Sequence, residues 1–214
     1  MQKDTALKAL FEPDKVDYFD QLFEKLDCSS KTIQNKLFEN CDFKHCNFDN
    51  ANLLKCKFVD CEFTCCTLNT VILANSVFSD VVFDNSKLMG INWPSAKWPQ
   101  IKLSSLINFY SCNISHSNFF GLSLSEINIQ ECKAHDVDFR EADLSHSNLT
   151  NTDFYQSLFI RTKLTAADFS EAINYSIDIT LNDVKKAIFT FPDAINLLQH
   201  FDIQVNGLPG SHFQ

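Results

Sequence analysis

Two pairs of closely spaced histidine and cysteine residues could, by residue type, bind a metal ion. His45 precedes Cys46, and His135 lies three positions after Cys132. Zinc takes thiolate and imidazole ligands, but they must converge on one ion. The cysteines fall at one phase of a five-residue period and the histidines at another, which predicts that the cysteines point inward and the histidines outward. We therefore expect no metal site and no cofactor.

The sequence offers no catalytic constellation either. Its 214 residues include only four glycines, with no GxSxG motif and no glycine-rich phosphate loop. Carboxylates are numerous, but their positions in the repeat keep their side chains apart. No pair is therefore expected to act as general acid and general base. These observations indicate a protein that is not an enzyme.

The element that positions these residues is a five-residue repeat. A large residue returns every five positions from Phe38 to Leu103 and, after one interval of six, from Phe109 to Phe169, with Ala134 the only small exception. Two positions before it lies a small residue, and seven of the nine cysteines occupy this second register. Alternating large and small residues fill a narrow interior without voids. The other three positions are mostly polar and must face water.

This pattern resembles the pentapeptide-repeat family, whose unit is a small residue, Asp or Asn, Leu or Phe, and two variable residues. The match covers Lys36 to Glu171. The resemblance implies an all-β fold, a right-handed quadrilateral β-helix with four pentapeptides per coil. About seven coils, stacked ~4.8 Å apart, would give a rod about 33 Å long. We expect this solenoid over residues 33–173, with a register break near 103–109.

The break carries its own signature. Trp93 and Trp98 are each followed by a proline, which cannot donate to a strand ladder. The interval of six from Leu103 to Phe109 indicates a single-residue insertion. We expect a bulge or altered corner here, and a packing role for the tryptophans rather than ligand stacking.

Both ends lose the five-residue period. Apolar residues at helical spacing between Thr5 and Leu26 predict a helical cap over residues 1–32, which would cover the edge of the first coil. In the tail, residues 174–214, we expect two short helices, the second opening at Pro192 and Asp193. The tail has more apolar residues than one coil end needs, so it is either a simple cap or, as we favour, a dimerisation segment. The predicted homodimer interface is Phe189, Phe191, Ile195, Leu198, Phe201 and Ile203.

Cysteines 20 residues apart should stack on successive coils, as in Cys41 and Cys61, Cys46 and Cys66, and Cys112 and Cys132. A spacing of ~4.8 Å falls within the Cα range of a disulfide, so distance alone leaves both states open. The packing role and a reducing compartment favour free thiols. The first 15 residues lack the features of a secretory signal, and no apolar run is long enough for a membrane helix, so we expect a cytoplasmic protein.

The net charge of −9 argues against direct binding of nucleic acid, which needs a basic surface. A narrow acidic rod could instead occupy a basic groove that normally accepts DNA. The acidic excess lies in the second half of the chain and spreads over all four predicted faces. The candidate acidic surface is Glu126, Glu131, Asp136, Asp138, Glu141, Asp143, Asp153 and Asp168.

Four segments give a narrower resemblance: MGINWPSAKWP, FFGLSL, HDVDFREADL and the tail from Ala172. They are similar to the albicidin-resistance and quinolone-resistance (Qnr) groups of the family. The resemblance implies a dimeric DNA mimic that binds DNA gyrase or topoisomerase IV and protects it from an inhibitor or toxin. Qnr proteins also carry loops that interrupt the coils. The alternatives are a structural or protein-interaction scaffold with no topoisomerase role and an immunity factor for a toxin made by the same cell.

Overall fold

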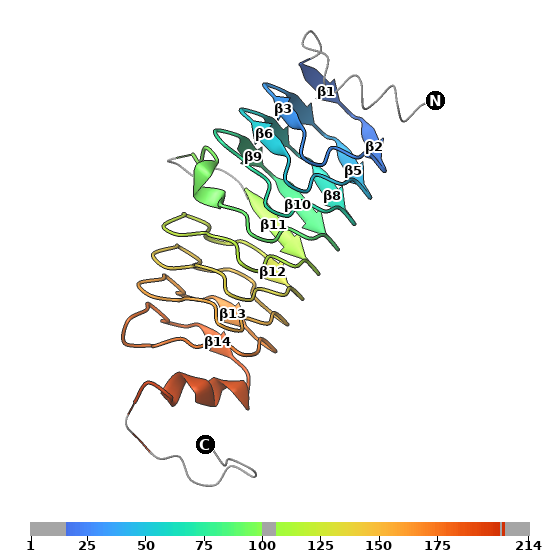
Figure 1. Cartoon of the computed structure of the whole chain (residues 1–214). Helices are drawn as coiled ribbons and strands as arrows, with labels where there is room; N and C mark the ends of the chain where they lie inside the picture. The colour runs from blue at the N-terminus through green and yellow to red at the C-terminus, as the bar shows by residue number, and fades with distance from the viewer. Residues whose placement is uncertain (1–15, 100–105, 202, 204–214) are drawn as a thin grey trace.

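The computed structural model describes residues 16–99, 106–201 and 203, and shows an all-β parallel solenoid of about eight turns (Figure 1). Successive five-residue segments form the sides of each coil, and each side stacks on the same side of the next coil. Tyr18 is thus in register with Phe38, and Phe38 with Phe58. Because side chains alternate along each short strand, the repeated large residue points inward and its two neighbours point outward.

The stacked sides form four faces, which we number in chain order. Face 1 contains β1 (Asp17–Phe19), β4 (Leu37–Glu39), β7 (Lys57–Val59) and β9 (Val77–Ser79). Face 2 contains β2 (Leu22–Glu24), β5 (Asp42–Lys44), β8 (Glu62–Thr64), β10 (Val81–Asp84), β11 (Ile107–Tyr110) and β12 (Ile129–Gln130), and later β13 (Asp168–Phe169) and β14 (Ile188–Phe189). Face 3 is a column of single bridges that begins at Asp27↔Asn47 and ends at Asp153↔Ile173. Face 4 contains β3 (Thr32–Gln34) and β6 (Asn52–Leu54), followed by bridges as far as Phe159↔Ile177.

Aromatic rings form the axis of the solenoid, as the repeat predicts. Phe43 and Phe63 on successive coils stack with ring centroids 4.5 Å apart and planes 7° apart. Phe38 and Phe43 on neighbouring faces meet edge to face, with centroids 5.4 Å apart. Both are favourable arrangements of aromatic quadrupoles, each contributing about 0.5–1.5 kcal/mol beyond burial.

The small residue of each repeat supplies hydrogen bonds as well as space. Ser76 Oγ donates to the Leu53 carbonyl at 2.7 Å and accepts the Cys56 N–H at 2.9 Å. The Cys66 thiol makes the same two contacts, with the Phe43 carbonyl at 3.2 Å and the Cys46 N–H at 3.3 Å. Buried backbone groups at the corners are thereby satisfied from the next coil. This explains why Cys, Ser and Thr recur at a position where size alone would admit alanine.

Replacing Ser76 by alanine should lower the free energy of unfolding by about 1–3 kcal/mol, because the buried Cys56 N–H then has no partner. Ser76→Cys keeps a donor and acceptor at this site and should cost less. Denaturant titration of both variants would measure the difference, with Ser79→Ala on the outside of the same coil as a control. Equal stabilities of the alanine and cysteine variants would contradict this role for the hydroxyl.

All nine cysteines are free thiols, and only Cys65, at an outer corner, is exposed. Burial raises the pKa of the Cys56 thiol to about 11 and that of Cys61 to about 12. The expectation of free thiols is confirmed. Since the thiolate is the reactive form, the interior cysteines should be inert.

We therefore expect a thiol reagent such as Ellman's reagent to modify one thiol per native chain and nine after denaturation. Cys65→Ser should remove the native reaction. Fewer than nine thiols in unfolded, unreduced protein would instead reveal disulfides between stacked coils.

The solenoid begins earlier than the sequence predicts. Tyr18 and Phe23 are interior residues whose rings stack on Phe38 and Phe43, at 5.1 and 4.9 Å. The helical cap predicted over residues 1–32 is therefore wrong from residue 17 onward. Phe19 and Leu22, which suggested a helix, are exposed on the outside of strands. Residues 1–15 lie outside the described residues.

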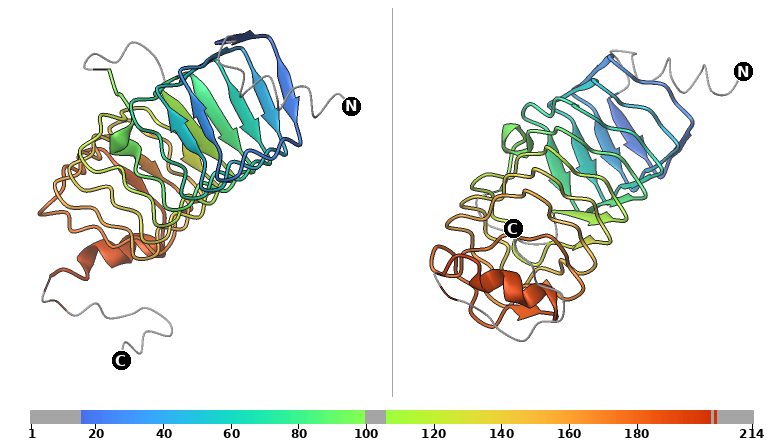
Figure 2. Two further views of the ribbon diagram at one scale, coloured as in Figure 1. Left: turned by 45° about the horizontal axis from the view of Figure 1, so that its top comes forward. Right: turned by 60° about the horizontal axis from the view of Figure 1, so that its bottom comes forward.

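The solenoid also continues beyond residue 173. β13 pairs with β14, and Lys163 bridges Asp183, so the first of the two predicted tail helices is wrong. The second is a 3-10 helix, η2 (Asp193–Leu198), which lies beyond the last coil (Figure 2). In its described residues, 174–201 and 203, the tail is thus a final coil and one short helix rather than a separate helical dimerisation module. In the described part of the chain, no helix is long and apolar enough to span a membrane.

The register break holds six additional residues, not one. Val82 pairs with Glu62, 20 positions earlier, whereas Val81 pairs with Ile107, 26 positions later. The chain leaves face 1 after Trp98 and returns at Leu106, and residues 100–105 lie outside the described residues. The sequence indicated only one of the six additional residues. Leu103 falls where a further repeat would place its large residue, so the other five were counted as a normal repeat.

The packing role of Trp93 is confirmed. It begins the 3-10 turn η1 (Trp93–Ser95), is buried, and stacks on Phe119 with centroids 5.7 Å apart. Trp98 packs against the same core, and its indole N–H donates to the Trp93 carbonyl at 2.8 Å. The two tryptophans close the interior at the point where the regular coil is interrupted.

Candidate acidic interface

Half of the predicted acidic residues are turn formers. Asp138, Asp143, Asp153 and Asp168 each precede an interior residue, are half-buried, and accept the backbone N–H two residues further on. The distances are 3.0, 3.1, 3.2 and 2.8 Å, in that order. This local bond is the usual reason for Asp at a tight turn. Their recurrence in the repeat therefore has a structural cause.

Cations of the same or the next coil neutralise several of these charges. Arg140 donates two hydrogen bonds to Asp138, at 2.9 and 2.7 Å, and they hold the pKa of that carboxyl below its ordinary value. Lys163 lies 3.3 Å from Asp143; partial burial works to raise the pKa of Asp143, but hydrogen bonds from Ser145 and Lys163 lower it on balance. The stabilisation from these depressed pKa values is present above about pH 4 and is lost as the pH falls through the folded values.

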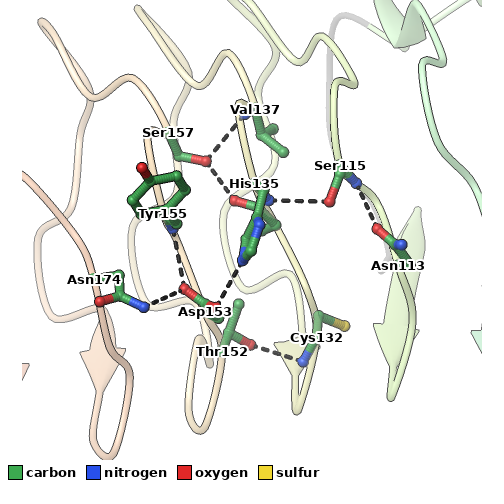
Figure 3. Close-up of polar contacts among 11 residues, drawn as sticks. Asn113, Ser115, Cys132, His135, Val137, Thr152, Asp153, Tyr155, Ser157 and Asn174 are labelled. Atoms are coloured by element: carbon green, nitrogen blue, oxygen red, sulfur yellow. Dashed lines mark hydrogen bonds and ion pairs between the residues drawn. The ribbon is translucent and has the colours of Figure 1, made fainter.

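Asp153 is held in a polar cluster on face 3 (Figure 3). His135 Nε2 lies 2.6 Å from Asp153 Oδ2, and Asn174 donates to Oδ1 at 2.8 Å. These bonds lower the pKa of Asp153 although partial burial opposes the shift. Cys132 is buried, and its N–H bonds to Thr152, so the predicted divergence of Cys132 and His135 is confirmed. The cluster ties neighbouring coils together.

The other four predicted residues occupy corners. Glu126, Glu131, Asp136 and Glu141 have φ between 53° and 64° and are exposed, each on a different corner of the tube. His116 lies 3.6 Å from Asp136, and Arg161 pairs with Glu141. The eight residues thus cover every face and corner, as the repeat phase predicted, and the structure does not bring them together into one surface.

The structure reveals a different acidic surface in the first half of the chain. We call it the acidic edge; it runs along the corner between faces 1 and 2 and consists of Asp20, Glu39, Asp60, Glu62 and Asp80. Asn40 fills the corner between Asp20 and Asp60, and donates to Asp20 at 2.5 Å. Among the described residues, none of these five carboxylates forms an ion pair. Two cations at the other side of face 2, Lys25 and Lys44, pair with Glu24 and Asp42.

The charge density of the acidic edge is close to that of a nucleic-acid strand. Its five carboxylates occupy four coils, about 19 Å at ~4.8 Å per coil, which is one charge per ~4 Å. One strand of DNA carries a charge every ~3.4 Å along the helix axis. The six-residue insertion emerges from the same corner, because Leu106 precedes Ile107 as Asp80 precedes its partner Val81.

A sequence signal for the acidic edge exists. Positions 20, 40, 60 and 80 hold Asp, Asn, Asp and Asp, at the 20-residue spacing of one coil. This column of corner residues could not be recognised while Asp20 was assigned to the predicted N-terminal helix. Summing charge over long segments hid it further, because lysines such as Lys55 and Lys87 balance the total from other sides of the tube.

The residues of the predicted dimer interface differ in how far they are exposed. Phe189 belongs to the core, where it stacks on Phe169 at 5.1 Å, and Ile195 and Leu198 in η2 are half-buried. The remaining three stay exposed at the C-terminal end: Phe191 at 69%, Phe201 at 38% and Ile203 at 56%. Leu181 and Ile188 of the last coil are exposed as well. The apolar end surface is therefore formed partly by residues that the sequence did not indicate.

Comparisons with known proteins agree with this geometry. No curated protein matches the chain in sequence, whereas the family profile described as a pentapeptide repeat region matches residues 36–106 and 91–169. Among solved structures, a trypsin-treated variant of QnrB1, a plasmid-mediated fluoroquinolone resistance protein, superposes with a TM-score of 0.59 at 18% identity, covering 89% of this chain and 98% of that one. Full-length QnrB1 gives a TM-score of 0.50 at 18% identity, covering 87% and 100%. At these identities the likeness shows a shared fold, and together with the profile it establishes that the chain belongs to the pentapeptide-repeat family.

Proposed function

We propose that this protein binds DNA gyrase or topoisomerase IV in place of DNA, through the acidic edge, and protects the enzyme from an inhibitor or toxin. The observation that carries the proposal is the acidic edge itself, a column of carboxylates that are exposed except for the half-buried Asp80, have no described cationic partners and have a charge spacing close to that of a DNA strand. The shared fold with a fluoroquinolone resistance protein supports the choice of enzyme.

The fold prepares this surface for binding. Parallel pairing in register fixes the corners of successive coils, so the carboxylates are already arranged before a partner arrives. Binding then requires little ordering of the backbone, which is one of the main costs of association. A basic groove that evolved to exchange its counterions for phosphates would accept these carboxylates in the same way. The interaction should weaken as salt rises.

The test is a supercoiling assay with purified gyrase, with and without a gyrase poison. We expect the protein to inhibit supercoiling at high concentration, to lose this effect as salt or competing DNA increases, and to raise the poison concentration needed for DNA cleavage. If it changes neither supercoiling nor the potency of the poison, a structural or protein-interaction scaffold without a topoisomerase role becomes the better description.

The proposed binding form is a homodimer through the C-terminal end. Phe191, Phe201 and Ile203 expose apolar surface there, and so do Leu181 and Ile188 of the last coil. Contiguous exposed apolar surface on a soluble protein usually marks an interaction site. A two-fold axis at this end would leave both acidic edges pointing away from the junction.

A further inference from the structure

The acidic edge begins between two exposed apolar side chains. Phe19 in β1 and Leu22 in β2 lie on the coil at the N-terminal end of the described solenoid, on either side of the corner residue Asp20 (Figure 1). Phe19 is 51% exposed and Leu22 is 59% exposed. Single apolar residues are common on protein surfaces, but two large ones that flank the same charged corner form a patch. We call this pair the apolar tip.

Strand register makes the apolar tip continuous with the acidic edge. Phe19 pairs with Glu39 of the next coil, and Glu39 pairs with Val59 of the coil after that. On the other side of the corner, Leu22 pairs with Asp42. Apolar and acidic side chains are therefore neighbours along the columns that border the corner. A partner that binds the carboxylates also meets the apolar tip.

The interior of this coil does not require the two apolar residues. Tyr18 and Phe23 point inward, are buried, and stack on aromatic rings of the next coil. Because side chains alternate along a strand, Phe19 and Leu22 point outward. A polar residue at either position would leave the strand pairing and the core unchanged. The apolar tip is thus better suited to a partner than to the stability of the chain.

Charge alone does not select one basic groove from another. Any groove that binds DNA phosphates by releasing counterions also attracts a column of carboxylates. Apolar contacts discriminate in a different way, because they stabilise a complex only where the partner offers a pocket of matching shape. A DNA backbone presents no aromatic or branched aliphatic side chain. The apolar tip therefore adds to the acidic edge a feature that DNA lacks.

We propose that Phe19 and Leu22 dock in an apolar pocket beside the basic groove of the topoisomerase, and that this contact selects the enzyme from other DNA-binding proteins. The carboxylates then speed the approach of the two proteins, and the apolar tip slows their dissociation. This inference rests on the proposed function and adds to it the residues that determine the choice of partner.

The test compares Phe19→Ser/Leu22→Ser with Ile72→Ser/Phe120→Ser in the full chain. The second pair is a matched control, since it also replaces one aromatic and one aliphatic residue, 42% and 50% exposed, on face 4, which does not border the acidic edge. Binding to purified gyrase is measured by biolayer interferometry over a series of salt concentrations. The tip variant should have a dissociation constant at least ~10-fold higher, because the complex buries less apolar area. The control should bind like the wild type.

The salt series separates the apolar tip from the acidic edge. The tip variant keeps every carboxylate, so its affinity should fall with salt as steeply as that of the wild type. Neutralising charge, as in Asp60→Asn/Glu62→Gln, should instead make the salt dependence shallower. Inhibition of a restriction endonuclease, which also has a basic DNA groove, measures selectivity. This inhibition should be the same for the tip variant and the wild type.

Four results would overturn the inference. The tip variant could bind gyrase like the wild type, or lose inhibition of gyrase and of the endonuclease equally. It could unfold at a lower denaturant concentration than the control, which would assign the two side chains to the stability of the chain. It could also change from dimer to monomer in sedimentation, which would make the tip a contact between copies. A wild-type protein that binds no gyrase at any salt concentration would refute the proposed function itself, a result distinct from binding that does not depend on the tip.

Discussion

Replacing Asp60, Glu62 and Asp80 by lysine is expected to weaken inhibition of gyrase supercoiling about 100-fold. Three favourable contacts with a basic groove are lost, at about 1 kcal/mol each for exposed charges, and every 1.4 kcal/mol is a factor of ten. Asp60 and Glu62 are exposed, Asp80 is half-buried at an outer corner, and none of the three forms a described ion pair, so the fold should be unaffected. Titration of the protein into a supercoiling reaction gives the inhibitory concentration directly.

The matched control reverses the same number of charges in the second half of the chain. Asp138, Asp143 and Asp153 were candidate contacts from the sequence, but each already faces Arg140, Lys163 or His135. Their replacement by lysine should change gyrase inhibition far less than the change at the acidic edge. Equal losses in the two triple variants would mean that net charge matters and the acidic edge does not.

Replacing Phe139 by alanine is expected to lower the free energy of unfolding by about 3–5 kcal/mol. Phe139 is fully buried and stacks between Phe119 and Phe159, at 5.3 Å from each. Its removal leaves a cavity in a tube whose neighbouring coils are held in register by the strand ladder and can close little of the gap. Denaturant unfolding followed by circular dichroism measures the loss.

Phe120 supplies the control, because it lies on the same face in the preceding coil but points outward and is 42% exposed. Phe120→Ala should change stability by about 0.5 kcal/mol or less, as is usual for exposed positions. Similar costs at Phe120 and Phe139 would contradict the inward and outward assignment of the repeat.

The interior of the solenoid could be predicted from the sequence because one period decides it. The N-terminal end could not, since Phe23 and Leu26 fit both a five-residue repeat and helical spacing. Only pairing with the second coil, such as Phe23 with Phe43, favours the strand. The insertion was underestimated for a related reason, because adding six residues shifts the five-residue period by the same single step as adding one.

The candidate site depends on relations between coils that composition does not contain. Asp143 and Lys163 are 20 residues apart and meet only because the coil has that length. Asp60 and Asp80 have the same separation, but they are like charges on a shared corner, so they increase the negative charge there. Reading the charges column by column, with the coil length as the period, would have separated these two cases.

The corner between Asp80 and Leu106 also shows how such a rod can change during evolution. Phe83 and Phe109 remain in register and stack at 5.4 Å although their coil is six residues longer than its neighbours. Length added at a corner is thus absorbed locally and leaves the hydrogen-bonded lattice above and below intact. Natural variants and engineered chains can therefore gain or lose peptide segments at this point without redesigning the core, which makes the corner a ready position for displaying new recognition sequences.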